Sequence, residues 1–238
     1  MIDLDFLAAT VRALLAGVPV TLGLTAGSVA CGGALAALAA FGRLAGGPVP
    51  DGLARLYVFV FRGTPLLVQI FLIYYGLGQF RPSLQAMGLW GFFREPYWCA
   101  LLALSLNTGA YTAEILRGGI LAVPHGALVA GRACGMPRLL LFRRVMLPLA
   151  ARQALPAYGN EVISVVKATS LASTITLLEI TGIAQKLIAQ SFRALEVFLC
   201  AGAFYLAVTF VVIGLVRAAE AWLAPDLRPR PAVAPRAA

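Results

Sequence analysis

Charged residues, lysine and histidine are scarce in this 238-residue chain, and its cysteines are scattered. Charged residues make up 12% of the sequence and hydrophobic residues 61%, whereas soluble globular proteins carry roughly 25% charged residues. Histidine occurs once, and the four cysteines include no Cys-x-x-Cys pair. The composition therefore excludes an ordinary soluble domain and offers no metal-ligand or thiol-redox spacing. It predicts a protein of the lipid bilayer.

The sequence also lacks the motifs of an enzyme. A Walker A loop needs Gly-Lys followed by serine or threonine, but the two lysines, Lys167 and Lys186, follow Val166 and Gln185. The only histidine, His125, stands before a glycine, with no nucleophile or metal-ligand pattern around it. We therefore expect no catalysis, no metal and no cofactor in this chain, and it cannot supply a P-loop for ATP.

Apolar runs long enough to cross a bilayer are abundant. A spanning helix needs about 20 residues, and five runs fit, at approximately 18–41, 53–78, 97–116, 155–184 and 194–216. We expect an all-α integral membrane protein in which residues 1–223 form a single transmembrane domain. The amino terminus lacks the basic flank of a cleavable signal peptide, so the first run is expected to be retained. The proline-rich stretch 224–238 is expected to be a disordered cytoplasmic tail.

The distribution of positive charge predicts how the protein is oriented across the membrane. The net charge is +9, but the arginines stand beside apolar runs, which is typical of topology signals rather than of nucleic-acid binding. Twelve lysines and arginines fall in segments 42–56, 117–152 and 217–238, against five in segments 1–17, 79–96 and 185–196. The positive-inside rule then places the amino terminus outside the cell and the carboxyl terminus in the cytoplasm.

Five ionisable residues lie inside the predicted spans, where a charge costs at least about 2.5–3.5 kcal/mol and is kept for a pathway, a site or a pair. Glu114 and Glu179 stand near span ends, where a charge can reach water. Glu161 is deeper and is followed by a run of polar residues. Two interpretations stay open for it: a polar translocation path, or a buried structural network in which it pairs with one of the cations. Those cations are Arg62 and Lys167.

Prolines within two spans predict kinks or breaks in the helices. Pro65 and Pro156 each remove a helix hydrogen bond, which membrane proteins tolerate where the freed backbone faces protein or a cavity. Such breaks often mark substrate sites in transporters, although a kink can also serve packing alone. The candidate residues of a substrate path are the polar side chains at or near these breaks: Thr64, Gln69, Asn107, Asn160 and Glu161.

Segment 117–152 is basic and too polar to span. Residues 126–135 predict a short helix that Gly135 ends. Pro137 suits the first turn of a second helix, which Pro148 is expected to stop. Glycines in the first helix allow close approach by another surface, so we interpret the segment as a cytoplasmic docking loop. An amphipathic helix lying on anionic lipid is the alternative.

Four ordered stretches resemble the inner-membrane permease subunits of ABC importers for polar amino acids, in the histidine, arginine and opine branch. The similarity covers roughly residues 15–223. The stretches are 61–69 (FRGTPLLVQ), 106–119 (LNTGAYTAEILRGG), 123–135 (VPHGALVAGRACG) and 154–170 (ALPAYGNEVISVVKATS).

The resemblance implies the ABC type I importer permease fold, with five spans, an external amino terminus and a coupling loop that docks into an ATPase. That loop typically carries a Glu-Ala-Ala, then a glycine and an Ile-x-Leu-Pro ending. Here Val129 stands in place of the glutamate, so an ion pair with the ATPase is missing. By this resemblance the docking residues are Gly126, Val129, Ala130, Gly131, Arg132, Gly135 and Met136.

The resemblance further implies a bacterial inner-membrane complex. Its expected partners are two copies of an ATPase that binds the ATP, a second permease that is either identical or related, and a periplasmic solute-binding protein. The carboxylate of Glu161 favours a cationic amino acid or an opine-like derivative as cargo. The alternative function is a secondary transporter or channel subunit that uses Glu161 and Lys167 as an ion or proton relay.

Overall fold

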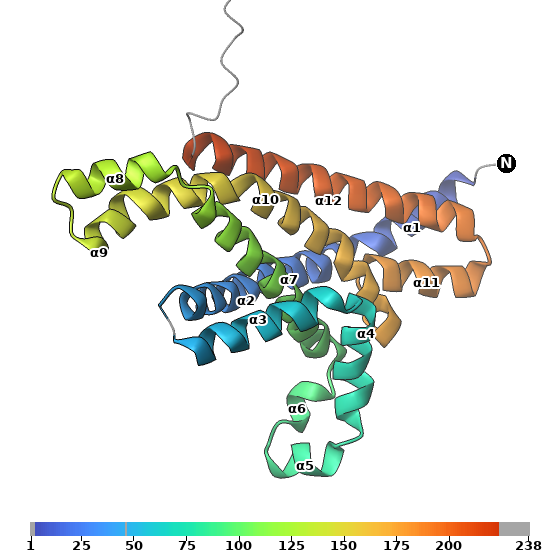
Figure 1. Ribbon diagram of the computed structural model, residues 1–238. Coiled ribbons are helices and arrows are strands. Elements are labelled where there is room, and N and C mark those ends of the chain that lie inside the picture. The colour runs from blue at the N-terminus through green and yellow to red at the C-terminus, as the bar shows by residue number, and fades with distance from the viewer. Residues whose placement is uncertain (1–2, 46, 224–238) are drawn as a thin grey trace, which may run out of the picture.

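The computed structural model describes residues 3–45 and 47–223, so the predicted tail at 224–238 lies outside the described residues. All regular structure within these ranges is helical (Figure 1). The elements are α1 (Leu4–Leu15), α2 (Val18–Ala45), α3 (Pro48–Gly63), α4 (Leu66–Phe71), the π-helix η1 (Leu72–Gly76), α5 (Arg81–Ala86), α6 (Trp90–Phe93), α7 (Pro96–Leu121), α8 (His125–Ala133), α9 (Arg138–Leu141), the π-helix η2 (Phe142–Met146), α10 (Leu147–Ala168), the 3-10 helix η3 (Thr169–Ile175), α11 (Ile180–Ser191) and α12 (Ala194–Leu223).

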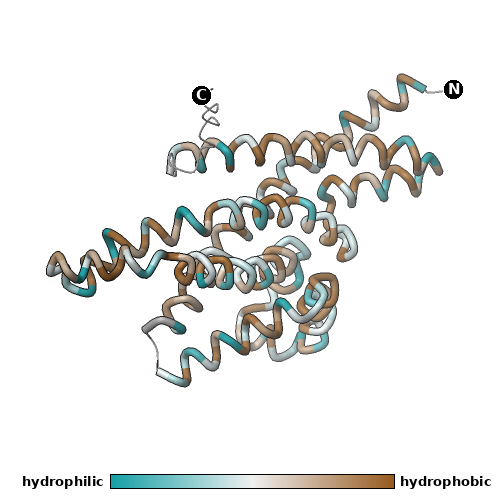
Figure 2. The backbone as a smooth tube through the Cα atoms, turned by 45° about the horizontal axis from the view of Figure 1, so that its top comes forward, coloured by the Kyte–Doolittle hydropathy of each residue, from teal (hydrophilic) through white to brown (hydrophobic). Residues whose placement is uncertain are grey.

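Three helical segments of the described chain are long and apolar enough to cross a membrane: Leu4–Arg43, Pro96–Leu121 and Ala194–Trp222. Two further segments qualify as bent pairs, which raises the number to five. Pro48–Gly63 and Leu66–Gly76 meet at 105°, and Arg138–Ile175 and Ile180–Ser191 meet at 46°. Figure 2 shows that hydrophobic residues cover most of each long helix. The predicted all-helical membrane fold is confirmed.

The connections between the long helices gather at two ends of the bundle. Figure 1 shows the α8–α9 hairpin, the α2–α3 connection and the end of α12 at one end, on the left. The amino terminus and the α11–α12 turn lie at the other end, on the right, and α5 and α6 project below. The segments that carry most of the arginines therefore share one end, as the positive-inside rule requires.

Small residues let α2 and α7 pack closely. A Cβ atom added at Gly32 would lie 2.8 Å from the Thr108 methyl and 3.1 Å from the backbone nitrogen of Gly109. A Cβ added at Gly109 would in turn lie 2.6 Å from the Tyr57 hydroxyl. Helices in lipid gain little from the hydrophobic effect and rely on such close backbone approach. This contact fixes α7 at the centre of the bundle.

Helix α1 lies outside every predicted span. Asp3 caps it by accepting a 3.1 Å hydrogen bond from the Phe6 N–H, and it pairs with Arg193 of the α11–α12 turn at 3.0 Å. These two contacts hold the pKa of the Asp3 carboxyl below its usual range. Leu14 packs against Ile180 in a fully buried cluster. Through these contacts α1, the amino-terminal helix, packs against α11 and α12.

The predicted interruption at Pro65 is a break, whereas the helix continues past Pro156. The chain breaks between Gly63 and Leu66, where Pro65 adopts an extended conformation and caps α4. Pro156 lies inside α10, which continues to Ala168. The break in this span comes later, after η3, where Thr176 takes a left-handed conformation at φ 66°.

The prediction that Pro148 stops the second loop helix is wrong. A π-helical turn over Phe142–Met146 immediately precedes this proline, which occupies the first turn of α10. A proline without an N–H is tolerated where the hydrogen-bond register changes and in a first helical turn. The helical path therefore runs without a stop from Arg138 into the membrane domain.

Glu179 is fully buried, which corrects the expectation that its charge reaches water near a span end. It caps α11 by accepting hydrogen bonds from the N–H groups of Thr181 and Gly182, at 2.9 and 2.8 Å. The hydroxyl of Tyr205 on α12 donates a third hydrogen bond to it. These donors compensate for the loss of hydration that burial imposes on the carboxylate. Glu179 therefore connects the break after η3 to α12.

Candidate functional site

The break at Pro65 is held by a compact amide network. The Gln69 side-chain nitrogen donates to the carbonyl of Phe61 at 2.9 Å and to the Thr64 hydroxyl at 2.9 Å. The Asn107 side-chain nitrogen donates to the same Phe61 carbonyl and to the Gln69 side-chain oxygen, both at 3.1 Å. Gln69 is buried, so its amide satisfies the carbonyls that the break releases from helical bonding. The network connects α3 and α4 to α7.

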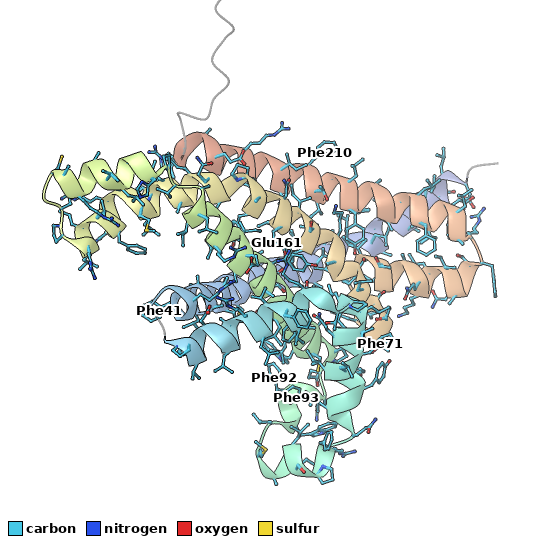
Figure 3. All side chains as sticks on the ribbon, in the orientation of Figure 1. Phe41, Phe71, Phe92, Phe93, Glu161 and Phe210 are labelled. Carbon is cyan, nitrogen blue, oxygen red and sulfur yellow. The ribbon has the colours of Figure 1, made fainter. Side chains whose placement is uncertain are left out.

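A cavity of about 290 Å³ lies beside this network and contains Glu161. Figure 3 shows Glu161 near the middle of the bundle. One of its oxygens accepts a 3.1 Å hydrogen bond from the Thr108 hydroxyl. We call this space the glutamate cavity. The lining comes from α4, α7 and α10: Leu66, Leu104, Asn107, Thr108, Tyr111, Glu161, Ser164, Val165 and Ala168.

The other polar residues of α10 lie away from Glu161. Asn160 is exposed and does not line the glutamate cavity. Lys167 is six residues further along the helix, which corresponds to roughly 240° around the helix axis. Within residues 3–45 and 47–223, Glu161 forms no salt bridge with Arg62 or Lys167. The structure therefore gives Glu161 a hydroxyl partner and an open cavity.

A second cavity of about 470 Å³ lies next to the first and is rich in arginine. We call it the arginine cavity; Arg43, Arg55, Arg62, Tyr111 and Glu114 line it together with Val58, Phe59 and Gly63. Tyr111 lines both cavities, and the Arg62 guanidinium carbon lies 5.1 Å from the centre of its ring. The two spaces therefore meet at an arginine stacked on a tyrosine.

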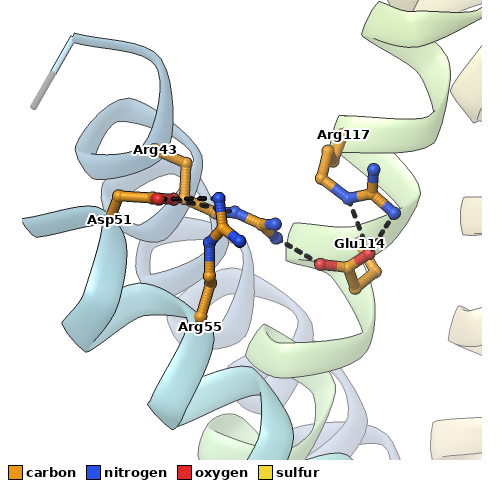
Figure 4. Close-up of polar contacts among 5 residues, drawn as sticks. All are labelled: Arg43, Asp51, Arg55, Glu114 and Arg117. Atoms are coloured by element: carbon orange, nitrogen blue, oxygen red, sulfur yellow. Dashed lines mark hydrogen bonds and ion pairs between the residues drawn. The ribbon is translucent and has the colours of Figure 1, made fainter. Parts of the chain in front are cut away.

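An ion-pair network includes Arg43, Arg55 and Glu114 of the arginine cavity (Figure 4). Glu114 pairs with Arg43 and, at 2.7 Å, with Arg117. Asp51 pairs with Arg55 at 2.8 Å and with Arg43 at 3.6 Å. The network joins the ends of α2, α3 and α7, and it gives the predicted intramembrane charge of Glu114 a structural partner on each side.

The α8–α9 hairpin projects from the bundle at the arginine-rich end (Figure 1). Gly135 takes φ +76°, a conformation that favours glycine, and α8 ends two residues before it, at Ala133 rather than at the predicted 135. Gly131 is buried, and a Cβ atom there would lie 2.4 Å from the Leu141 side chain. Its close approach is therefore to the second arm of the same hairpin. The exposed members of the predicted docking set are Gly126, Val129, Ala130, Arg132 and Gly135, and Met136 is half-buried.

From the sequence, Glu114 is predicted only as a charge near a span end, and Thr108 and Tyr111 are not predicted as site residues. Thr108, Tyr111 and Glu114 repeat at intervals of three on α7 and therefore share one face of that helix. Their spacing is visible in the sequence, but only the structure shows that this face borders both cavities. Arg43 and Arg55 were counted only as topology signals, and both line the arginine cavity.

Comparison with known proteins agrees with this arrangement. Residues 32–225 match the family described as the binding-protein-dependent transport system inner membrane component. The chain belongs to this family. It is therefore a multi-pass permease of the bacterial inner membrane and not an enzyme, and ATP is bound by an ATPase partner. The family relationship favours an ABC importer permease over the alternative of a secondary transporter or channel subunit, and it implies a paired permease and a binding protein as further partners.

Relatives of this permease match over nearly their whole length. The octopine transport system permease protein OccM of Rhizobium meliloti is 57% identical over 223 residues, covering 94% of this chain and 91% of its own. The nopaline transport system permease protein NocM of Agrobacterium fabrum is 52% identical, covering 99% and 98%. The histidine/lysine/arginine/ornithine transport system permease protein HisM of Escherichia coli is 41% identical, covering 87% of each chain.

Solved structures show the same fold. A chain from the crystal structure of an amino acid ABC transporter with histidines superposes with a TM-score of 0.82 at 31% identity, covering 92% of this permease and 98% of that chain. A chain of the MetNI methionine ABC transporter superposes with a TM-score of 0.70, covering 89% and 96%, but at 17% identity it supports the fold alone.

Proposed function

We propose that this permease carries cationic amino acids or their opine derivatives past Glu161 in an ATP-driven importer. The observation that carries the proposal is a carboxylate that lies in the membrane domain beside a cavity, with one oxygen bound by Thr108. Such a group favours a guanidinium, ammonium or imidazolium partner. The names of the relatives support this cargo class, because octopine, nopaline, histidine, lysine, arginine and ornithine all carry such a group.

The other residues predicted for the substrate path differ in what their side chains contact. Asn107 lines the glutamate cavity, and its side-chain oxygen accepts no hydrogen bond from the described residues, so it is available to cargo. Thr64 and Gln69 act through the helix break, whose shape they maintain. Asn160 is exposed on α10 and is proposed to face the path at another stage of transport or the second permease.

The complex is proposed to contain two permeases, two ATPase copies and a periplasmic solute-binding protein. The second permease is either a copy of this chain or a related one. The amino terminus is periplasmic and the carboxyl terminus cytoplasmic, which is supported by the clustering of arginines at the end that carries the α8–α9 hairpin. The hairpin then projects toward the ATPase, and its exposed residues around Val129 form the docking surface.

The proposal is tested by uptake into vesicles that contain this permease, its second permease and the ATPase, with the binding protein outside. Uptake should require ATP on the hairpin's side of the membrane and no proton gradient. Val129 is 47% exposed on α8, and we propose that the ATPase groove that receives it is apolar. Val129→Glu should therefore lower ATP-driven uptake by about tenfold, because it buries an unpaired carboxylate.

Val129→Leu is the matched control, since it keeps an apolar side chain and should retain uptake. Faster uptake by Val129→Glu would contradict the apolar docking surface and show that the ATPase keeps a basic residue at this point. Uptake driven by a proton gradient without ATP would contradict the proposed function itself.

A further inference from the structure

The glutamate cavity and the arginine cavity share Tyr111 and differ in the charge of their linings. One face of α7 supplies Thr108 to the first cavity, Glu114 to the second and Tyr111 to both. Glu161 is the acidic residue of the glutamate cavity. At the junction, the Arg62 guanidinium carbon lies 5.1 Å from the centre of the Tyr111 ring. A cargo molecule at the junction therefore meets a carboxylate on one side and a guanidinium on the other.

Arg62 differs from the other arginines around the arginine cavity in its contacts. Within residues 3–45 and 47–223 it forms no salt bridge, and its side chain is exposed at the arginine cavity. An arginine within a membrane segment is costly unless it faces water, a polar path or a counter-charge. The contact with Tyr111 orients the guanidinium and leaves its N–H donors available.

Other charges around the arginine cavity are already paired. Arg43, Arg55 and Arg117 are tied to Asp51 and Glu114 (Figure 4). With Arg62 the group contains four guanidiniums against two carboxylates. The excess of positive charge repels a simple cation and attracts a carboxylate. Since Arg62 is the unpaired member, it is the group that a carboxylate reaches.

We propose that Arg62 is a specificity-determining residue that binds a carboxylate of the cargo while Glu161 binds its cationic group. This inference rests on the proposed function and narrows its cargo to molecules that carry both charges. Each added carboxylate strengthens binding, because it meets the positive arginine cavity. The order of affinity is therefore octopine, which has two carboxylates, then arginine, which has one, then agmatine, which has none.

Direct binding to the purified permease–ATPase complex tests this, without the solute-binding protein, whose own selectivity would mask the effect. The three probes are agmatine, arginine and octopine. Arg62→Gln should weaken binding of arginine and octopine by about 10- to 100-fold, the range expected for a lost hydrogen bond to a charged group. Agmatine binding should stay unchanged or tighten. Arg62→Lys should restore part of the loss, and Arg94→Gln, at an exposed position that lines neither cavity, is the control.

The outcomes separate this inference from the proposed function. Glu161→Gln should weaken all three probes, and if it weakens none, the proposed cargo site is wrong. If Glu161→Gln weakens all three but Arg62→Gln weakens agmatine as much as octopine, Arg62 has only a structural role and the inference is overturned. Should Arg62→Gln fail to assemble, the wild-type ranking decides, because agmatine binding more tightly than octopine contradicts the inference.

Discussion

Replacing Glu161 by glutamine is expected to reduce uptake of an arginine-like cargo by about 10- to 100-fold. The amide keeps the shape of the side chain and an oxygen that can accept the Thr108 hydrogen bond, but it loses the charge that attracts a guanidinium. A hydrogen bond to a charged group contributes about 1.5–3 kcal/mol, which corresponds to this range. The measurement is the initial uptake rate at several cargo concentrations in vesicles supplied with ATP.

Glu95→Gln is the matched control, because it also removes one acid from the permease. Glu95 is exposed at the start of α7, where its side chain does not cap the helix, and pairs with Arg94 at the surface. Uptake by this variant should equal that of the wild type. An unchanged rate and affinity in Glu161→Gln would remove Glu161 from the path.

Replacing Glu179 by alanine is expected to destabilise the permease by about 2–5 kcal/mol. The change leaves the N–H groups of Thr181 and Gly182 and the hydroxyl of Tyr205 without their buried acceptor. An unsatisfied buried polar group costs about 1–3 kcal/mol, and loss of a helix cap adds to that. The readout is the midpoint of thermal unfolding of the detergent-solubilised complex, together with the yield of the intact assembly.

The control for this prediction is Glu95→Ala, which removes another glutamate at a helix start. Because Glu95 makes no capping hydrogen bond, its loss should shift the midpoint little. Tyr205→Phe removes one of the three donors and should give an intermediate loss. Equal stability of Glu179→Ala and Glu95→Ala would contradict the role of Glu179 as the link between α11 and α12.

The fold class could be predicted from the sequence because the bilayer imposes strict demands. Each of the useful signals depends on a short stretch of sequence. Apolar runs reflect the thickness of the bilayer, arginines reflect the positive-inside rule, and Pro65 lacks the N–H that a helix needs. Pro148 does not stop the helix, for a physical reason: it lies in the first turn of α10, next to a π-turn, where a missing N–H costs little. At Pro156 α10 also continues.

The candidate site was predictable only in part. Glu161 stood out because a carboxylate within a span is costly. Gln69 also stood out as polar, but the sequence could not show that its amide is engaged by the carbonyls of the break. Arg62 and Tyr111 are 49 positions apart, and only the packing of α3 against α7 brings them into contact. Long-range pairing of this kind leaves no local pattern.

The shared face of α7 is a second example of a feature that the sequence predicts only in part. Helical spacing predicts that Thr108, Tyr111 and Glu114 lie in a row. Which element they face depends on the close approach of α2 at Gly32 and on the break that turns α4 away from α3. Those are properties of the assembled bundle, so the two cavities became visible only with the structure.

The most direct test of the account is whether cargo occupies the glutamate cavity. Ser164 lines that cavity and is exposed to it, so a Ser164→Cys variant places a thiol there once the accessible native cysteines, Cys31, Cys134 and Cys200, are replaced by serine. A water-soluble thiol reagent should label this cysteine, and arginine or octopine should slow the labelling, whereas Ser83→Cys on α5 should be labelled equally with and without cargo. Labelling of Ser164→Cys that cargo leaves unchanged would contradict a transport path through this cavity.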